Sequence, residues 1–180
     1  MKVFLNPGHA PNGNPDPGAC GCGLRECDVA KSVADLVAHY LTAAGVTVVG
    51  NMQSDDLLDI TETANASGAD IFVSIHCNAF NGSAQGTEVE VHPGSRAGRA
   101  LGGCIQRQIV DSLGTADRGL KDRPDLWVIK RTDMPAVLVE LAFIDNDEDA
   151  EFQYRKRYEV TCDSVSGRPQ KQKAQIGVFL

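Results

Sequence analysis

The chain has 180 residues, of which 42% are hydrophobic, and a formal net charge of −7. This length suffices for one well-buried core but is short for two domains. An acidic chain argues against nucleic acid as a partner, because proteins that bind a duplex normally carry a basic face; the basic run at 155–157 is more typical of a solvated surface. No stretch approaches the roughly 20 apolar residues that span a bilayer, and the short apolar run at 1–5 predicts no signal peptide.

The first part of the chain predicts a strand, a long loop and a helix. Residues 1–5 form an apolar run that the turn at Pro7 and Gly8 ends. Residues 10–24 are rich in Pro, Gly and Asn, and a loop of this length in a compact domain usually carries function. After Asp28, a predicted N-cap, apolar residues recur at helical spacing until Gly45.

The rest of the chain alternates strands and helices. The predicted strands are 46–49, 71–75, 86–91, 126–129 and 136–141, and the predicted helices are 55–66 and about 96–113. The run at 86–91 alternates like a half-exposed strand, whereas 136–141 is apolar enough to be central in a sheet. This order predicts a layered α/β domain with a mostly or partly parallel sheet.

Six cysteines are unusual for this length: Cys20, Cys22, Cys27, Cys77, Cys104 and Cys162. The paired Cys-x-x-Cys spacing of structural zinc sites is absent, which disfavours a thiolate metal site. We therefore expect free or partly buried thiols, with a disulfide as the main alternative.

Two histidines and one carboxylate follow apolar strands. His9 and His76 come just after predicted strands, and Glu140 ends the apolar run 136–139. Ligands of open α/β sheets bind in the crevice outside such strand ends, so these side chains can converge. A buried carboxylate is costly without a partner, and an ion pair or a hydrogen-bonded strand end is the structural alternative for Glu140.

Two histidines and a carboxylate form a common catalytic zinc set that leaves one position for water. Glu26, at the start of the first long helix, can supply the carboxylate, with Glu140 as general base. Spacing alone would let Glu26 and Glu140 exchange these roles. We expect His39 on the surface and His92 in a turn that can still border a substrate groove.

Several segments resemble, in order, the zinc-dependent N-acetylmuramoyl-L-alanine amidases (the Amidase_3 family), which cleave peptidoglycan between N-acetylmuramic acid and L-alanine. The segments are 6–9 (NPGH), 23–26 (GLRE), 74–79 (SIHCNA), 86–91 (GTEVEV), 118–121 (RGLK), 134–140 (MPAVLVE) and 143–146 (FIDN). Cys77 stands where the motif has alanine.

The resemblance implies a single twisted six-stranded sheet with helices on both faces. It also implies a Zn²⁺ ion held by His9, Glu26 and His76, with Glu140 as the catalytic glutamate and peptidoglycan as substrate. We expect residues 1–150 to form the catalytic domain of a monomer that acts on the cell wall.

Residues 151–180 depart from the family, whose members usually end in a helix packed on the sheet. Residues 147–158 can begin such a helix, but 161–180 are polar and basic without a helical period. This divergent segment can complete the same domain. Two other functions remain: a zinc amidohydrolase with another substrate, and a peptidoglycan-binding module without activity, which the presence of all four key residues disfavours.

Overall fold

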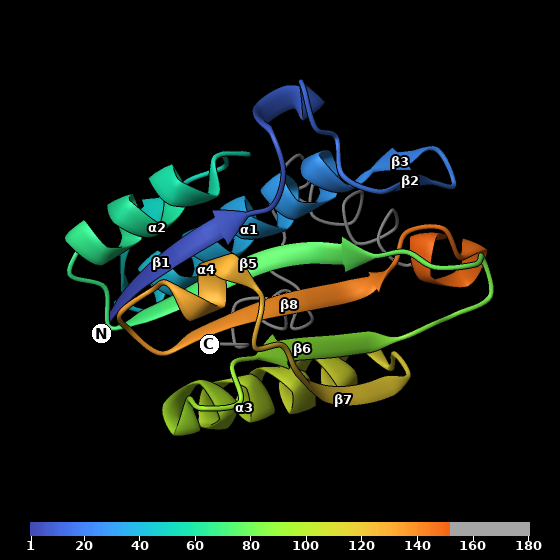
Figure 1. The fold of residues 1–180 in the computed structure, drawn as a ribbon. Coiled ribbons are helices and arrows are strands. Elements are labelled where there is room, and N and C mark those ends of the chain that lie inside the picture. Colours follow the sequence, from blue (N-terminus) through green and yellow to red (C-terminus); the bar gives the residue numbers. More distant parts are fainter. Residues whose placement is uncertain (152–180) are drawn as a thin grey trace.

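The structure is a computed structural model, and it describes residues 1–151. The chain alternates strands with helices, as the sequence predicts (Figure 1). In chain order the elements are β1 Lys2–Pro7, the 3-10 helix η1 Pro11–Gly13, β2 Cys20–Gly21, β3 Leu24–Arg25, α1 Glu26–Ala43, β4 Thr47–Asn51, α2 Leu57–Ala66, β5 Ile71–Asn78, β6 Thr87–Val91, α3 Arg96–Leu113, β7 Asp117–Asp122, α4 Trp127–Lys130 and β8 Ala136–Phe143.

A six-stranded sheet in the order β4-β1-β5-β8-β6-β7 forms the centre of the domain. Strands β4, β1, β5 and β8 run parallel to one another. Strand β6 runs antiparallel to β8, and β7 is parallel to β6. The expected α/β class with a mixed six-stranded sheet is confirmed, and β8 is central between β5 and β6 as its apolar sequence predicts.

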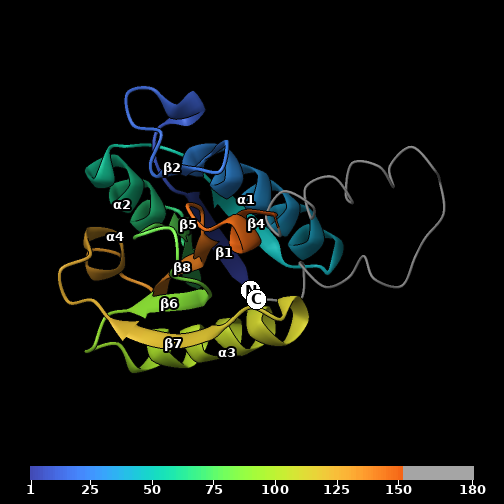
Figure 2. The same cartoon turned by 90° about the vertical axis from the view of Figure 1, so that its right-hand side faces the viewer.

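Alternation along the strands creates two cores, one on each face of the sheet. Val3 and Leu5 point to the face covered by α1 and α3, whereas Phe4 lies with residues of α2 and α4 on the other face. Figure 2 shows α2 and α4 on one side of the sheet and α1 on the other. None of the helices in residues 1–151 is long and apolar enough to cross a membrane.

The α2/α4 face depends on a stacked pair of phenylalanines, Phe4 and Phe72, with ring centroids 5.8 Å apart. Both rings are buried, so truncating one leaves a cavity. Phe72→Ala is expected to lower the free energy of unfolding by about 3–5 kcal/mol. Urea unfolding followed by circular dichroism measures this. Phe80→Ala, which removes an exposed ring, is the control and should change stability by less than about 0.5 kcal/mol.

The beginning of α1 differs from the sequence expectation. The helix begins at Glu26, two residues before the predicted cap Asp28, and Arg25 at the N-cap makes no side-chain cap bond. Instead, the backbone N–H groups of Glu26 and Cys27 donate to the carbonyls of Ala19 and Pro17. The long loop therefore satisfies the first orphan donors of the helix, and this fixes where Glu26 lies.

The predicted strand at 126–129 is wrong, because this segment contains the one-turn helix α4. Val128 and Ile129 are buried against Phe72 and Ile60 on the α2/α4 face, so tertiary packing overrides the β-like local pattern. Strand β7 at Asp117–Asp122 was not predicted, since its polar sequence DRGLKD shows no apolar alternation.

Strand β6 is buried along its whole length rather than half-exposed. Glu88 and Glu90 would be costly to bury alone, but Arg118 Nε lies 2.7 Å from Glu88 Oε2 and Arg123 Nη1 2.5 Å from Glu90 Oε1. These cations reach across from β7 and the residue after it.

The start of the predicted C-terminal helix is confirmed, because residues 147–151 are helical. The remainder of that helix, the basic run at 155–157, Cys162 and the segment 161–180 lie outside the described residues.

Candidate metal centre and catalytic site

Three side chains from separate segments meet at one end of the sheet. His9 follows β1, Glu26 is the first residue of α1, and His76 lies in β5. His9 Nε2 is 2.9 Å from Glu26 Oε2, and His76 Nδ1 is 2.8 Å from Glu26 Oε1. One ligand atom from each residue lies within 4.8 Å of the others. The sequence pattern therefore predicted a set of residues that the fold brings together.

His76 and Glu140 do not end their strands, in contrast to the expectation. Strand β5 continues to Asn78 and β8 to Phe143, and His76 is paired in register with Glu140. The period of two places both residues on the face of Phe72 and Leu138, toward α2 and α4. Glu140 thus lies beside the metal-ligand cluster.

Two glycines allow the loop to press against the imidazole rings. A Cβ atom on Gly8 would lie 2.3 Å from His76 Cε1, and one on Gly18 would lie 2.5 Å from His9 Cδ2. Gly18 also has φ +69°, which a side chain would disfavour. The glycines of this loop are therefore required for the approach of its backbone to the two histidines.

Hydrogen bonds outside the cluster orient its members. His9 Nδ1 lies 2.7 Å from Asp16 Oδ2, which leaves Nε2 toward the cluster. The Glu26 carboxylate accepts from the backbone N–H groups of Ala19 at 2.8 Å and Cys77 at 3.0 Å. Sequence reasoning missed Asp16, because an aspartate in a Pro- and Gly-rich loop looks like an ordinary turn residue.

Gln53 was also missed. Its Nε2 donates to the backbone carbonyls of Gly8, at 3.0 Å, and Cys27, at 2.8 Å. The amide therefore ties the His9 loop to the first turn of α1. No local pattern in the sequence indicates this role, since it depends on how two distant segments pack.

Glu26 and the two histidines are close enough for hydrogen bonds and charges to shift the pKa values of Glu26 and His9. Burial alone would raise the pKa of Glu26, but the hydrogen bonds to His76 and His9 outweigh it and hold the pKa well below its usual range. Burial lowers the pKa of His9, but the hydrogen bonds and charges of Glu26 and Asp16 dominate and raise it to about 9. Without a metal, His9 is therefore an imidazolium at neutral pH.

Glu140 has the opposite electrostatic setting. Burial, followed by the negative charges of Glu26, Glu90 and Glu88, raises the pKa of Glu140 to about 8. Its Oε2 is buried and has no hydrogen-bond partner among the described residues. Such a carboxyl group is costly for the fold and is typical of functional sites.

The residues of the cluster fit a zinc ion. Two imidazole nitrogens and one carboxylate oxygen are the ligand types of catalytic zinc sites, which keep a further position open. Zinc bonds of about 2.0–2.1 Å in tetrahedral geometry separate ligand atoms by roughly 3.3 Å. The two histidines contact different oxygens of Glu26, at 2.9 and 2.8 Å. One ligand atom from each of the three residues lies within 4.8 Å of the others, so small side-chain movements would bring the three atoms to this spacing.

Asp16 is expected to strengthen metal binding by fixing the orientation and basicity of His9. Asp16→Ala should weaken zinc affinity by about tenfold, the lower end of the range for such partners, because the Asp16 side chain is 51% exposed. Competition with a fluorescent zinc chelator measures this. Glu62→Ala removes the same charge from an exposed position of α2 and should leave zinc affinity unchanged.

Zinc uptake should also release a proton. The pKa of His9 in the metal-free protein is about 9, and a zinc ligand must be neutral. Below pH 9, each unit of acidification should therefore lower the apparent zinc affinity by about tenfold for this one proton. Calorimetry in buffers of different ionisation enthalpy measures the proton count. An affinity independent of pH between 6 and 8 would contradict the assignment.

Within the described residues, the cluster contains no cysteine and no further histidine. His39 is exposed on α1, as predicted. His92 lies in a turn, where its Nδ1 accepts from Gly94 N and its carbonyl from Ser95 N. Cys20, Cys22, Cys27 and Cys104 are free thiols, which agrees with the expectation for the cysteines in the described part of the chain.

An α/β sheet that brings two histidines and a carboxylate together beside a second, buried carboxylate is typical of metal-dependent hydrolases. The family model described as N-acetylmuramoyl-L-alanine amidase, Amidase_3, matches residues 3–163. The chain belongs to this family. The family and the class of enzyme expected from the sequence are thereby confirmed.

Curated relatives and solved structures support the same family. The chain is 41% identical over 155 residues to the uncharacterized protein YqiI of Bacillus subtilis strain 168, covering 83% of this chain and 73% of YqiI. It is 38% identical over 154 residues to the N-acetylmuramoyl-L-alanine amidase LytC of the same strain, covering 82% of this chain but 30% of LytC. The crystal structure of an N-acetylmuramoyl-L-alanine amidase from Clostridium difficile 630 has a TM-score of 0.77 at 26% identity, covering 92% of this chain and 95% of that one.

Proposed function

We propose that this chain hydrolyses the amide bond between N-acetylmuramic acid and L-alanine in peptidoglycan. His9, Glu26 and His76 hold a zinc ion, and Glu140 is the catalytic carboxylate. The observation that carries the proposal is the convergence of these three ligands in one cluster directly beside Glu140, whose buried Oε2 is without a hydrogen-bond partner in the described residues. Catalysis is assigned to residues 1–150, with the cell wall as the place of action and a monomer as the active form.

The geometry favours one of the two role assignments that spacing leaves open. Glu26 is hydrogen-bonded to both histidines, and its pKa is held low, as suits a ligand that stays ionised. Glu140 is next to the cluster and has a raised pKa. This supports Glu26 as ligand and Glu140 as the group that moves a proton.

Each residue then has a defined part in the reaction. When bound, zinc supplies Lewis-acid activation of a water molecule and of the amide carbonyl. Glu140 accepts the proton of the attacking water and passes it to the departing nitrogen of L-alanine. In the metal-free protein, burial and neighbouring carboxylates raise the pKa of Glu140 above its ordinary value, which favours a group that can take up a proton. Asp16 holds the ring of His9, and Ala19 and Cys77 hold the carboxylate of Glu26.

Product analysis of digested cell walls tests the proposal. The zinc-loaded protein should expose new L-alanine amino groups on purified peptidoglycan and release no acetate. Release of acetate would instead identify a sugar deacetylase, and new amino groups on other residues would identify a peptidase. Binding to cell walls without any product would identify a non-catalytic module. Each of these three outcomes contradicts the amidase assignment.

A further inference from the structure

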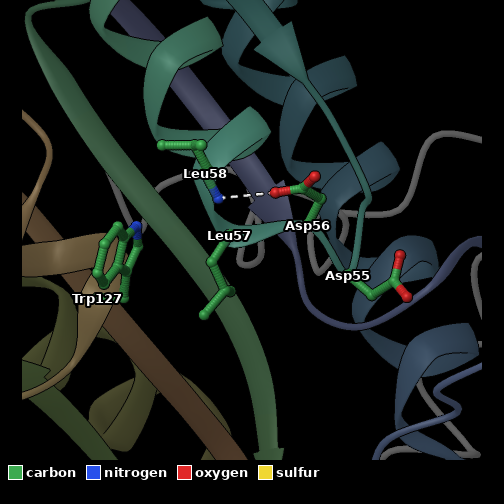
Figure 3. Close-up of a pocket in the computed structure, with 5 residues that line it drawn as sticks. All are labelled: Asp55, Asp56, Leu57, Leu58 and Trp127. Atoms are coloured by element: carbon green, nitrogen blue, oxygen red, sulfur yellow. Dashed lines mark hydrogen bonds between the residues drawn. The ribbon is translucent and has the colours of Figure 1, made fainter.

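An open groove of about 620 Å³ lies between the start of α2 and α4, lined by Asp55, Asp56, Leu57, Leu58 and Trp127. Figure 3 shows Trp127 of α4 across from the first residues of α2. Leu57, Leu58 and Trp127 are 48%, 54% and 38% exposed. Large apolar side chains gathered at the surface mark a binding site more often than scattered ones do.

The side chains of the groove are held in place. Asp56 caps α2 by accepting from the N–H groups of Leu58 and Asp59, which fixes the first turn of the helix. The guanidinium of Arg131 lies over the Trp127 ring, 4.8 Å from its centroid. One face of the indole is thus supported by the protein. A preformed apolar surface of this kind loses little conformational entropy when a ligand binds.

The groove is continuous with the metal-ligand cluster. A cavity of about 260 Å³ is lined by His9, His76 and Asp16, among others. This cavity shares Asp55, Leu57 and Trp127 with the groove. A substrate that reaches the cluster can therefore extend along the groove without leaving the protein surface.

The chemistry of the groove distinguishes the two halves of the substrate. On the carbonyl side of the scissile amide the substrate is a strand of N-acetylated sugars, which is uncharged once the lactyl group is amidated. On the nitrogen side it is a peptide that carries carboxylates. An indole and two leucines can contact sugar C–H faces and acetyl methyl groups, and carboxylates accept hydrogen bonds from hydroxyl groups.

The charged residues on the two sides of Glu140 also favour the glycan in the groove and the peptide on the other side. Asp55 and Asp56 line the groove, and Arg131 borders it through its contact with Trp127. Two carboxylates against one cation disfavour a peptide with carboxylates of its own. On the opposite flank of Glu140, Arg118 and Lys121 of β7 pair with Glu88 at 2.7 and 4.0 Å, so two cations there face one carboxylate. Strand β7 is separated from β5 by β8 and β6, so the two flanks have different electrostatic character.

We propose that the groove between α2 and α4 binds the glycan strand beyond the N-acetylmuramic acid whose amide is cleaved, with Trp127 and Leu58 as its sugar-contacting residues. The proposal rests on the amidase function and adds the orientation in which the substrate lies on the protein. The glycan runs over α2 and α4, and the stem peptide runs toward β7.

Kinetics with two substrates tests the groove. Leu58 lines the groove but not the cavity at the cluster. Leu58→Ser should raise KM for a tetrasaccharide muramoyl peptide by about tenfold, as expected for losing one apolar contact. It should leave KM for a single-sugar muramoyl peptide, and kcat for both, unchanged. Phe80→Ala, which removes an exposed ring outside the groove, is the matched control and should change neither KM.

Binding can be followed separately, because Trp127 is the single tryptophan of the chain. A neutral tetramer of N-acetylglucosamine should shift or quench its fluorescence in a saturable way, and Leu58→Ser should weaken this binding. If the tetramer leaves the fluorescence unchanged, or if Leu58→Ser affects both substrates equally, the groove is not a glycan site. If neither substrate is cleaved by the unaltered protein, the amidase assignment fails, and the fluorescence titration still decides whether the groove binds sugars.

Discussion

Replacing Glu140 with glutamine is expected to lower kcat by about 10²–10⁴-fold, the usual contribution of a positioned acid–base group, while zinc stays bound. Glutamine has nearly the size of glutamate but cannot take up the proton of the attacking water. Because Glu140 is not part of the cluster of His9, Glu26 and His76, its loss leaves all three ligands in place. KM should change far less than kcat.

The fold should tolerate this substitution. Burial and three neighbouring carboxylates already disfavour the charged form of Glu140 and raise its pKa to about 8. A neutral amide at this position therefore resembles the protonated carboxyl group and removes no stabilising ion pair. The unfolding midpoint in urea should be equal to or higher than that of the parent protein, which separates a catalytic effect from misfolding.

Steady-state turnover of a soluble muramoyl peptide and the zinc content of the same sample are the two measurements. Glu62→Gln, at an exposed position of α2, is the matched control and should behave as the parent protein does. The role of Glu140 as proton-transfer group is wrong if the glutamine variant keeps a kcat within about threefold of the parent, or if it loses zinc together with activity.

The placement of the two histidines could be predicted because it depends on local signals. Apolar runs that stop at the Pro7-Gly8 turn and at His76 indicate strands, and the ends of parallel strands meet at one edge of a sheet. Glu26 carries no such signal. Its position depends on how the long loop caps α1 through Ala19 and Pro17. The start of a predicted helix made Glu26 a possible ligand, but only the family resemblance distinguished its role from that of Glu140.

The errors in the fold come from segments whose structure is set by distant partners. The polar strand β7 forms at the edge of the sheet, where it pairs only with β6, and its Arg118 meets the buried Glu88. In α4, Val128 and Ile129 look like strand residues but are buried against α2. Neither partner is visible within a window of a few residues, so periodicity alone cannot identify these elements.

His76→Ala is expected to lose the bound zinc, in contrast to Glu140→Gln, which should keep zinc and lose proton transfer. His76→Ala removes one of three protein ligands, and the remaining His9 and Glu26 do not make up the ligand number of a stable zinc site. Zinc should fall from about one per chain to near none after dialysis. Turnover should be lost with it and should recover only at high concentrations of added zinc.

In the metal-free protein, His76→Ala should also lower the stability of the fold. His76 Nδ1 and Cys77 N both contact Glu26 Oε1, at 2.8 and 3.0 Å, so the alanine variant leaves Glu26 buried with fewer partners. We expect a loss of about 1–3 kcal/mol in the free energy of unfolding, the usual cost of a buried acceptor that loses a partner. A variant that instead lost several times this amount would show that His76 is needed mainly for folding.

His39→Ala is the matched control, because it removes an exposed histidine from α1 and should change neither zinc content nor turnover. Glu140→Gln and His76→Ala together separate the two roles that spacing left open. If Glu140 were the ligand and Glu26 the base, the glutamine variant at position 140 would lose zinc. Retention of zinc in Glu140→Gln with its loss in His76→Ala therefore fits only the assignment that the hydrogen bonds of Glu26 support.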